Sequence, residues 1–190
     1  DKGVGIFGAT LRALRMQDSA IGVEFLTPDF QGYQQQSVDH MQRTLASLSF
    51  TGADWPSLVW GHNVETVPSL YRVARKGSKY SRSLRLLELA AKTAGVETKS
   101  AIMLGLGETR AQVEEALRDL RAHDVDMVTI GQYLQPSAKH HPVVRYWEPA
   151  EFDALAAAGR RLGLVHVEAG PLVRSSYHAR EQAEGLSGEG

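Results

Sequence analysis

The feature that most constrains this chain is a regular alternation of strand-like and helix-like segments along its 190 residues. The segments with the short, apolar or β-branched pattern of strands are residues 21–26, 57–60, 98–104, 125–130 and 164–168. The segments with apolar side chains at helical spacing are residues 3–16, 37–48, 66–74, 81–94, 111–123 and 149–162. Strands that alternate with helices of this length predict parallel β–α–β units with right-handed crossovers, and so an α/β fold.

Boundary signals support these segments. Pro149 is suited to the first turn of a helix, and Gly95 and Gly163 are suited to ending one. Ser37 is expected to cap the helix that follows it, and residues 31–36 are expected to form a solvent loop. About five β–α units are fewer than the eight of a closed barrel, so the pattern predicts a partial barrel.

Composition excludes several classes of protein. The length fits one domain with its own core, and the apolar and charged fractions are those of globular proteins. A net charge of −1 argues against a nucleic-acid-binding surface. No apolar run is long enough to span a bilayer, so no membrane association is expected. The absence of cysteine excludes disulfides and suits a reducing compartment such as the cytoplasm.

Polar residues and glycines follow the predicted strands. Because active sites of parallel α/β barrels gather at the carboxyl ends of strands, these residues are expected to converge. They are His62, Asn63 and Glu65; Gly105, Gly107 and Glu108; Gln132, Tyr133 and Gln135; and the segment from Arg174 to Tyr177.

Each group also permits a purely structural interpretation. Gly105 and Gly107 allow a ligand to approach the backbone, or they form a tight turn with Glu108 at a helix start. In either case Glu108 is expected on the rim and not in the core. Asn63 offers a donor and an acceptor to ribose hydroxyls, or it forms a turn before a helix. Gln132 belongs either to a ligand site or to a turn at the rim.

Four segments carry a resemblance to a known family: residues 61–67, 98–109, 129–137 and 174–178. In this order they resemble lipoyl synthase, a family of radical S-adenosylmethionine enzymes, and the resemblance extends from Ala9 to Gln182. The stretch 62–67 matches the family pattern His-Asn-x-Glu-Thr-Val at each position. The stretch 101–108 is similar to the pattern Gly-x-Ile-x-Gly-x-x-Glu, except that Ala101 and Met103 replace its first glycine and its isoleucine.

The resemblance implies a partial (β/α) barrel of the radical S-adenosylmethionine type that lacks its first strand and cluster loop. Residues 1–170 would form the barrel core and residues 171–190 a C-terminal tail. The chain would be a fragment of a sulfurtransferase that inserts sulfur at C6 and C8 of a protein-bound octanoyl chain. The fragment by itself would be inactive. Its substrate would be an octanoylated lipoyl domain or H-protein, and its electron donor a ferredoxin or flavodoxin. The parent would be cytoplasmic, or in an organelle matrix if it is eukaryotic.

The resemblance also implies the cofactors and the residues that contact them. The family uses S-adenosylmethionine and two [4Fe–4S] clusters, whose cysteine ligands are absent from this chain. Either Ser176 or Ser175 would ligate the auxiliary cluster through its hydroxyl oxygen. The expected contacts to S-adenosylmethionine are Asn63, Glu65, Gly105, Gly107, Glu108 and Gln132.

Two other functions remain open from the sequence. The chain would then be a degenerate, non-catalytic module that binds S-adenosylmethionine or another nucleoside. Alternatively, it would be a phosphate-binding partial-barrel enzyme without iron, in which Gly105–Gly107 cradles an anion at a helix N-terminus.

Overall fold

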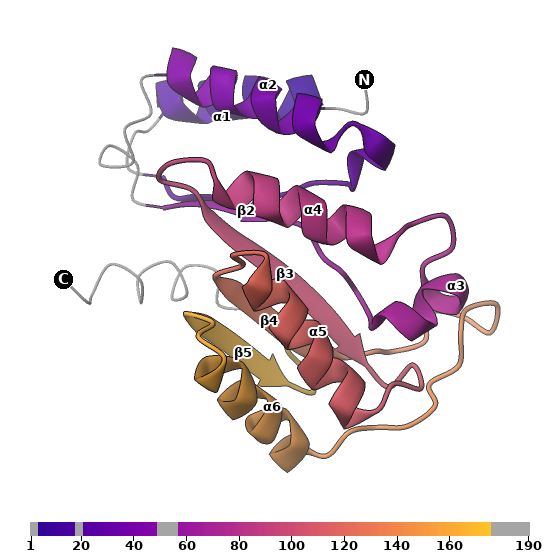
Figure 1. The fold of residues 1–190 in the computed structure, drawn as a ribbon. Helices are drawn as coiled ribbons and strands as arrows, with labels where there is room; N and C mark the ends of the chain where they lie inside the picture. Colours follow the sequence, from indigo (N-terminus) through magenta and orange to yellow (C-terminus); the bar gives the residue numbers. More distant parts are fainter. Residues whose placement is uncertain (1–3, 18–20, 49–56, 176–190) are drawn as a thin grey trace.

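The computed structural model describes residues 4–17, 21–48 and 57–175. Its centre is a five-stranded sheet made of β1 (Val23–Leu26), β2 (Leu58–Gly61), β3 (Glu97–Leu104), β4 (Met127–Gln132) and β5 (His166–Gly170). Every pairing is parallel, and the strands lie side by side in chain order (Figure 1). The predicted α/β fold is confirmed, and the unbroken strand order is consistent with a partial (β/α) barrel, because a doubly wound sheet would reverse its order.

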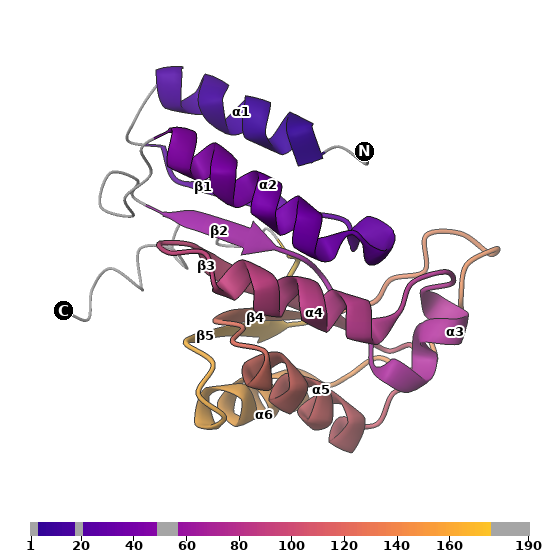
Figure 2. The same cartoon turned by 45° about the horizontal axis from the view of Figure 1, so that its top comes forward.

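The helices form a row along the sheet. They are α1 (Val4–Gln17), α2 (Gln34–Ser47), α3 (Tyr71–Ala74), α4 (Tyr80–Ala91), α5 (Arg110–Ala122) and α6 (Pro149–Arg161), with short 3₁₀ turns η1 (Phe30–Gly32) and η2 (Pro68–Leu70). In Figure 2, α1, α2 and α4 follow one another beside β1 and β2, and α5 and α6 lie at the other end of the row. In the part of the chain that the structure describes, no helix has the length and apolar character needed to cross a membrane.

Alternate side chains of the strands face the helices and build two apolar clusters. In the first, Trp60 is fully buried and its ring centroid lies 5.1 Å from that of Phe25, among side chains of α1, α2 and α4. In the second, Ile102 and Ile130 pack with Phe152 and other apolar side chains of α5 and α6. The helices therefore cover one face of the sheet, and the remaining side chains point to the other face.

That other face is polar near the amino ends of the strands. Lys99 is 2% exposed, and its ammonium lies 2.9 Å from the Glu24 carboxylate. Toward the carboxyl ends the same face carries smaller or apolar residues, Ala101, Met103 and Gly131. Space for a ligand is therefore left at the carboxyl ends.

The segment before α2 differs from the prediction. The solvent loop predicted over residues 31–36 is confirmed only for residues 31–33, which form an exposed turn, because α2 begins at Gln34. Ser37 lies buried inside the helix instead of capping it. Gln34 is buried because its side-chain amide donates to the carbonyl of Asp29 at 2.7 Å. The helix predicted over residues 66–74 is also shorter, since Val67 is extended before Pro68 and only a 3₁₀ turn and one helical turn follow.

Candidate functional site

An open cavity of about 460 Å³ lies at the carboxyl ends of β3 and β4. Its walls include Asn63, Glu65, Ala101, Met103, Thr129, Gly131, Gln132, Tyr133, Val173, Arg174 and Ser175. Three of the four predicted segments therefore meet around one space, as expected for residues that follow parallel strands. Two other hollows, each of about 470 Å³, lie over α1 and α2 and contain none of the predicted site residues.

Glu65 is held beside β3 in an unusual backbone conformation. Its φ is +67°, its amide donates to the carbonyl of Ala101 at 2.9 Å, and its carbonyl accepts from the amide of Met103 at 2.7 Å. Burial raises the pKa of the Glu65 carboxyl, whereas the Arg75 charge and a hydrogen bond from Asn63 act to lower it. A left-handed residue that is not glycine is costly, so Glu65 keeps this conformation because its surroundings, including the two bonds to β3, hold it there.

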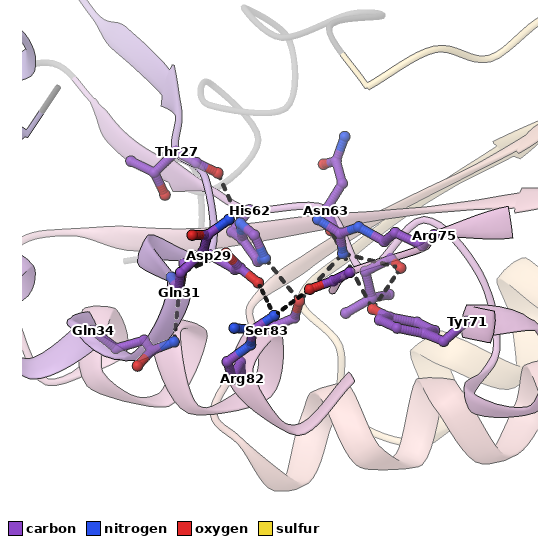
Figure 3. A network of polar contacts seen from close by, with 12 residues as sticks. Thr27, Asp29, Gln31, Gln34, His62, Asn63, Tyr71, Arg75, Arg82 and Ser83 are labelled. Carbon is purple, nitrogen blue, oxygen red and sulfur yellow. Dashed lines mark hydrogen bonds and ion pairs between the residues drawn. The ribbon is translucent and has the colours of Figure 1, made fainter. Parts of the chain in front are cut away.

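His62 does not line the cavity. It is 1% exposed, and its Nδ1 donates to the carbonyl of Thr27 at 2.7 Å, since a carbonyl only accepts (Figure 3). Its Nε2 therefore accepts from the Ser83 hydroxyl at 2.9 Å. Burial lowers the pKa of His62 to about 4, so the ring is neutral at pH 7. The imidazole joins the ends of β1 and β2 to α4.

The same network continues on the far side of His62. Asp29 forms an ion pair with Arg82 at 3.1 Å and accepts a hydrogen bond from the amide of Gln31 (Figure 3). Phe30, Gln31 and Gly32 all have positive φ, so the loop after β1 is held in a strained conformation by these contacts.

Glu108 lies inside its own loop. It is 5% exposed, and its oxygens accept from the amides of Gly105 at 2.6 Å and Leu106 at 3.0 Å and from the indole Nε1 of Trp147 at 2.9 Å. The expectation that Glu108 stands free on the rim is therefore wrong, because three donors draw it inward. Its role as a cofactor contact remains a prediction.

The glycines of this loop do not face the cavity. Gly105 has φ of +103°, and a Cβ there would meet the Gln132 side chain and the carbonyl of Arg145. Gly107 has φ of +116° and lies near Val144. Because Glu108 already occupies the amides of Gly105 and Leu106, these two donors are not free to cradle a phosphate.

Gln132 lines the cavity and also forms hydrogen bonds to the segment between β4 and α6. Its side-chain amide donates to the carbonyls of Tyr133 at 3.1 Å and Arg145 at 3.2 Å, and its oxygen accepts from the amide of Trp147 at 3.1 Å. Its amide group is engaged within the protein, so a contact to S-adenosylmethionine through it also remains a prediction.

The last described residues close one side of the cavity. The chain turns back after β5, and the carbonyl of Val173 packs directly against Gly131, where any Cβ would overlap it. Arg174 and Ser175 then line the cavity. Of the two candidate cluster ligands, Ser175 lies at this wall, and Ser176 lies outside the described residues.

Two residues in or beside the cavity were not among the predicted site residues. Thr129 is 2% exposed, lines the cavity, and its hydroxyl has no hydrogen-bonding partner in the described part of the chain. Arg75 donates to the carbonyls of Asn63 and Val64. The strand pattern places Thr129 in a strand but does not indicate which face of the sheet its side chain occupies. Nothing in the sequence indicates that Arg75, rather than the nearby Arg72, binds the backbone beside the cavity.

No metal-binding cluster is found where the structure is described: no three His, Cys, Asp or Glu side chains of residues 4–17, 21–48 and 57–175 lie together. The 190-residue chain also has no cysteine, the usual ligand of iron–sulfur clusters. The described residues therefore do not fit a [4Fe–4S] cluster by themselves.

Comparisons with known proteins support the resemblance seen in the motifs, although no family model matches. The chain is 54% identical over 184 residues to a lipoyl synthase of Methylococcus capsulatus. The aligned residues make up 96% of this chain and 54% of that protein. It is 50% identical over 186 residues to lipoyl synthases of Xanthomonas oryzae pv. oryzae and Stenotrophomonas maltophilia, which is 97% of this chain. These matches cover 52% and 53% of the two relatives. The chain thus spans about half the length of the curated relatives it matches.

Proposed function

We propose that this chain, which belongs to the lipoyl synthase family, is part of an enzyme that inserts two sulfur atoms at C6 and C8 of a protein-bound octanoyl chain. The main support is identity of 50–54% over 96–97% of the chain. The matched region includes the cavity and every segment that lines it. The activity is that of a sulfurtransferase, and the whole reaction requires the longer protein.

The cavity is suited to S-adenosylmethionine, a nucleoside with a cationic sulfonium and an amino-acid end. Its volume of about 460 Å³ falls in the range of small-molecule sites. The Glu65 carboxylate complements a positive charge or a ribose hydroxyl, and the Asn63 amide offers a donor and an acceptor. The unpartnered Thr129 hydroxyl is the kind of buried polar atom that a ligand satisfies.

S-adenosylmethionine supplies a 5′-deoxyadenosyl radical in enzymes of this class. The residues of this chain bind and orient the cofactor and keep water away from it. We assign Asn63 and Glu65 to direct contact. Gly105, Glu108 and Gln132 act at the same end of the sheet, where their hydrogen bonds fix the loops around the cavity, and Gly107 supplies a positive φ in the same loop.

Iron–sulfur clusters enter this proposal only through the longer protein. Two [4Fe–4S] clusters need thiolate ligands that this chain does not have. We propose that Ser175 or Ser176 contributes a hydroxyl ligand to one of them, and the position of Ser175 at the cavity wall supports this assignment. On this view residues 1–170 are the barrel core and residues 171–190 a tail that reaches the site.

The partners and compartment follow from the same proposal. The substrate is an octanoylated lipoyl domain or H-protein, the electron donor a ferredoxin or flavodoxin, and the compartment the cytoplasm. Neither nucleic acid nor a membrane is required.

The decisive experiment uses the longer protein, anaerobically reconstituted with iron and sulfide. It is incubated with S-adenosylmethionine, a reductant and an octanoylated lipoyl domain, and 5′-deoxyadenosine and lipoyl-lysine are measured by mass spectrometry. Both products are expected. Binding of S-adenosylmethionine without 5′-deoxyadenosine would instead identify a non-catalytic nucleoside-binding module.

A variant separates the tail from the rest of the site. Replacing Ser175 and Ser176 together with Ala is expected to abolish lipoyl formation and to spare 5′-deoxyadenosine, because in this proposal the serine hydroxyl ligates only the cluster that supplies sulfur. Lipoyl formation at the parental rate would contradict a ligand role for either serine.

A further inference from the structure

We propose that Arg75 is a positioning residue for the cavity, which fixes the Asn63–Glu65 segment and the charge of Glu65 for binding S-adenosylmethionine. The inference rests on the function proposed above and adds a residue that does not itself line the cavity. It starts from the hydrogen bonds of one guanidinium group at the end of α3.

The Arg75 guanidinium binds the backbone immediately before Glu65. Its Nη1 donates to the carbonyl of Asn63 at 2.7 Å, with a longer contact of 3.4 Å to the carbonyl of Val64 (Figure 3). The Tyr71 hydroxyl donates to the same Val64 carbonyl at 2.8 Å. Two consecutive peptide carbonyls are therefore held by side chains from the two ends of α3.

The guanidinium is itself held in place by other side chains. Nη1 lies 3.2 Å from both the Tyr71 hydroxyl and the Ser83 hydroxyl, and Ser83 donates to the neutral His62. Arg75 thus connects α3 and α4 to the turn after β2. Such a connection fixes the position of the charge as well as that of the carbonyls.

The Asn63–Glu65 segment needs support from both sides. On one side, the Glu65 amide and carbonyl bond to β3 through Ala101 and Met103. On the other, Arg75 binds the carbonyls that precede Glu65. A left-handed residue with a side chain persists only when its surroundings hold it, so loss of Arg75 releases one of the two restraints.

Arg75 also acts on the charge of Glu65. Burial raises the pKa of this carboxyl and Arg75 opposes that rise, as does a hydrogen bond from Asn63. Of the other ionisable groups in the described residues, Tyr71 interacts electrostatically with Glu65, and Arg174 lines the same cavity. Without Arg75 the carboxylate becomes protonated at a higher pH and loses its attraction for a cation.

The test measures the dissociation constant of S-adenosylmethionine from pH 8 to pH 6 in the reconstituted longer protein, by calorimetry. Arg75→Gln removes the charge, and Arg75→Lys keeps a charge on a shorter side chain that has no Nη1 group. Arg72→Gln is the matched control, since Arg72 is an exposed arginine of the same helix.

Arg75→Gln is expected to bind about tenfold more weakly at pH 8, and its affinity is expected to begin to fall at a higher pH than that of the parent. Arg75→Lys is expected to bind more weakly than the parent at pH 8 but to keep the parental pH profile. Arg72→Gln is expected to match the parent throughout. If Arg75 only held the backbone, Arg75→Gln would lower the affinity by the same factor at every pH. That result would overturn the part of the inference that concerns the charge of Glu65.

Parental affinity and pH profile in Arg75→Gln would overturn the inference and leave the proposed function intact. If Arg75→Gln does not fold, parental affinity in Arg75→Lys overturns the inference instead. Absence of binding by the parent protein would overturn the proposed function, and the inference with it.

Discussion

The indole Nε1 of Trp147 donates a hydrogen bond to the Glu108 carboxylate at 2.9 Å, and both side chains are buried. The same carboxylate accepts from the amides of Gly105 and Leu106. The loop after β3 and the segment that leads into α6 therefore share one buried hydrogen-bond acceptor.

Replacing Glu108 with Ala is expected to lower the free energy of unfolding by about 3 kcal/mol, because three buried donors lose their acceptor. Glu108→Gln is expected to cost less, since its amide oxygen still accepts one of the bonds. Urea denaturation measures both, with Glu115→Ala, an exposed change on α5, as the control. A loss in Glu108→Ala no larger than in the control would contradict the structural role.

Replacing Gly131 with Ala is expected to displace the chain at Val173, because the new methyl group overlaps the Val173 carbonyl. The cost is about 1–3 kcal/mol of stability, as for other overpacked sites, together with weaker binding of S-adenosylmethionine. Gly22→Ala is the control, since a Cβ there lies at an ordinary 3.6 Å from Ser57. Thermal unfolding measures the loss of stability, and calorimetry measures the loss of affinity. If Gly131→Ala keeps the parental stability and affinity, the chain at Val173 can move without cost, which would contradict the prediction.

Replacing Thr129 with Val is expected to change stability and binding in opposite directions. Removal of an unpartnered buried hydroxyl raises the free energy of unfolding by about 1 kcal/mol, because the group is desolvated without compensation. If the hydroxyl bonds the ligand, affinity for S-adenosylmethionine falls by up to about tenfold. Thr66→Val removes another unpartnered buried hydroxyl, outside the cavity lining, and is expected to affect stability alone. Equal binding by the two variants would remove Thr129 from the ligand site.

Acid is expected to destabilise the fold through His62. Its pKa is about 4 when folded against an ordinary 6.5, so the unfolded chain takes up a proton first. Stability from this residue is complete above pH 6.5 and is lost as pH falls toward 4, by about 3 kcal/mol in all. Glu65, whose pKa is raised by burial, acts in the opposite direction.

His62→Gln isolates the histidine contribution, because glutamine can donate to the Thr27 carbonyl and accept from Ser83 without titrating. Denaturant unfolding at pH 7 and pH 4.5 is expected to show a smaller loss of stability in the variant than in the parent. The same loss of stability in both proteins would mean that His62 takes up its proton as readily in the folded state as in the unfolded state.

The sequence predicted the strands and their parallel alternation with helices, because these depend on local patterns of apolar residues. Convergence of Asn63, Glu65 and Ser175 on one cavity was also predictable, since each follows a strand of a parallel sheet. These predictions needed no knowledge of individual side-chain partners.

The errors concern polar residues whose partners are distant in sequence. His62 and Glu108 have the composition of rim residues, yet their partners Thr27, Ser83 and Trp147 draw them inside. Gln34 is also buried, although its partner is near in sequence: its side-chain amide donates to the carbonyl of Asp29, a bond that no helix-capping rule anticipates. Burial of a polar side chain is decided by the donors and acceptors around it, and these are known only when the chain is folded.

The wall formed by Val173, Arg174 and Ser175 also bears on the order in which the molecule is built. During synthesis the amino-terminal part of the chain leaves the ribosome first, so β1 to β4 emerge before residues 173–175. A nascent chain that already holds most of the sheet therefore presents Gly131 and Thr129 uncovered. The cavity is the last part of the described structure to be completed, and a product that terminates after β4 would lack the wall formed by residues 173–175.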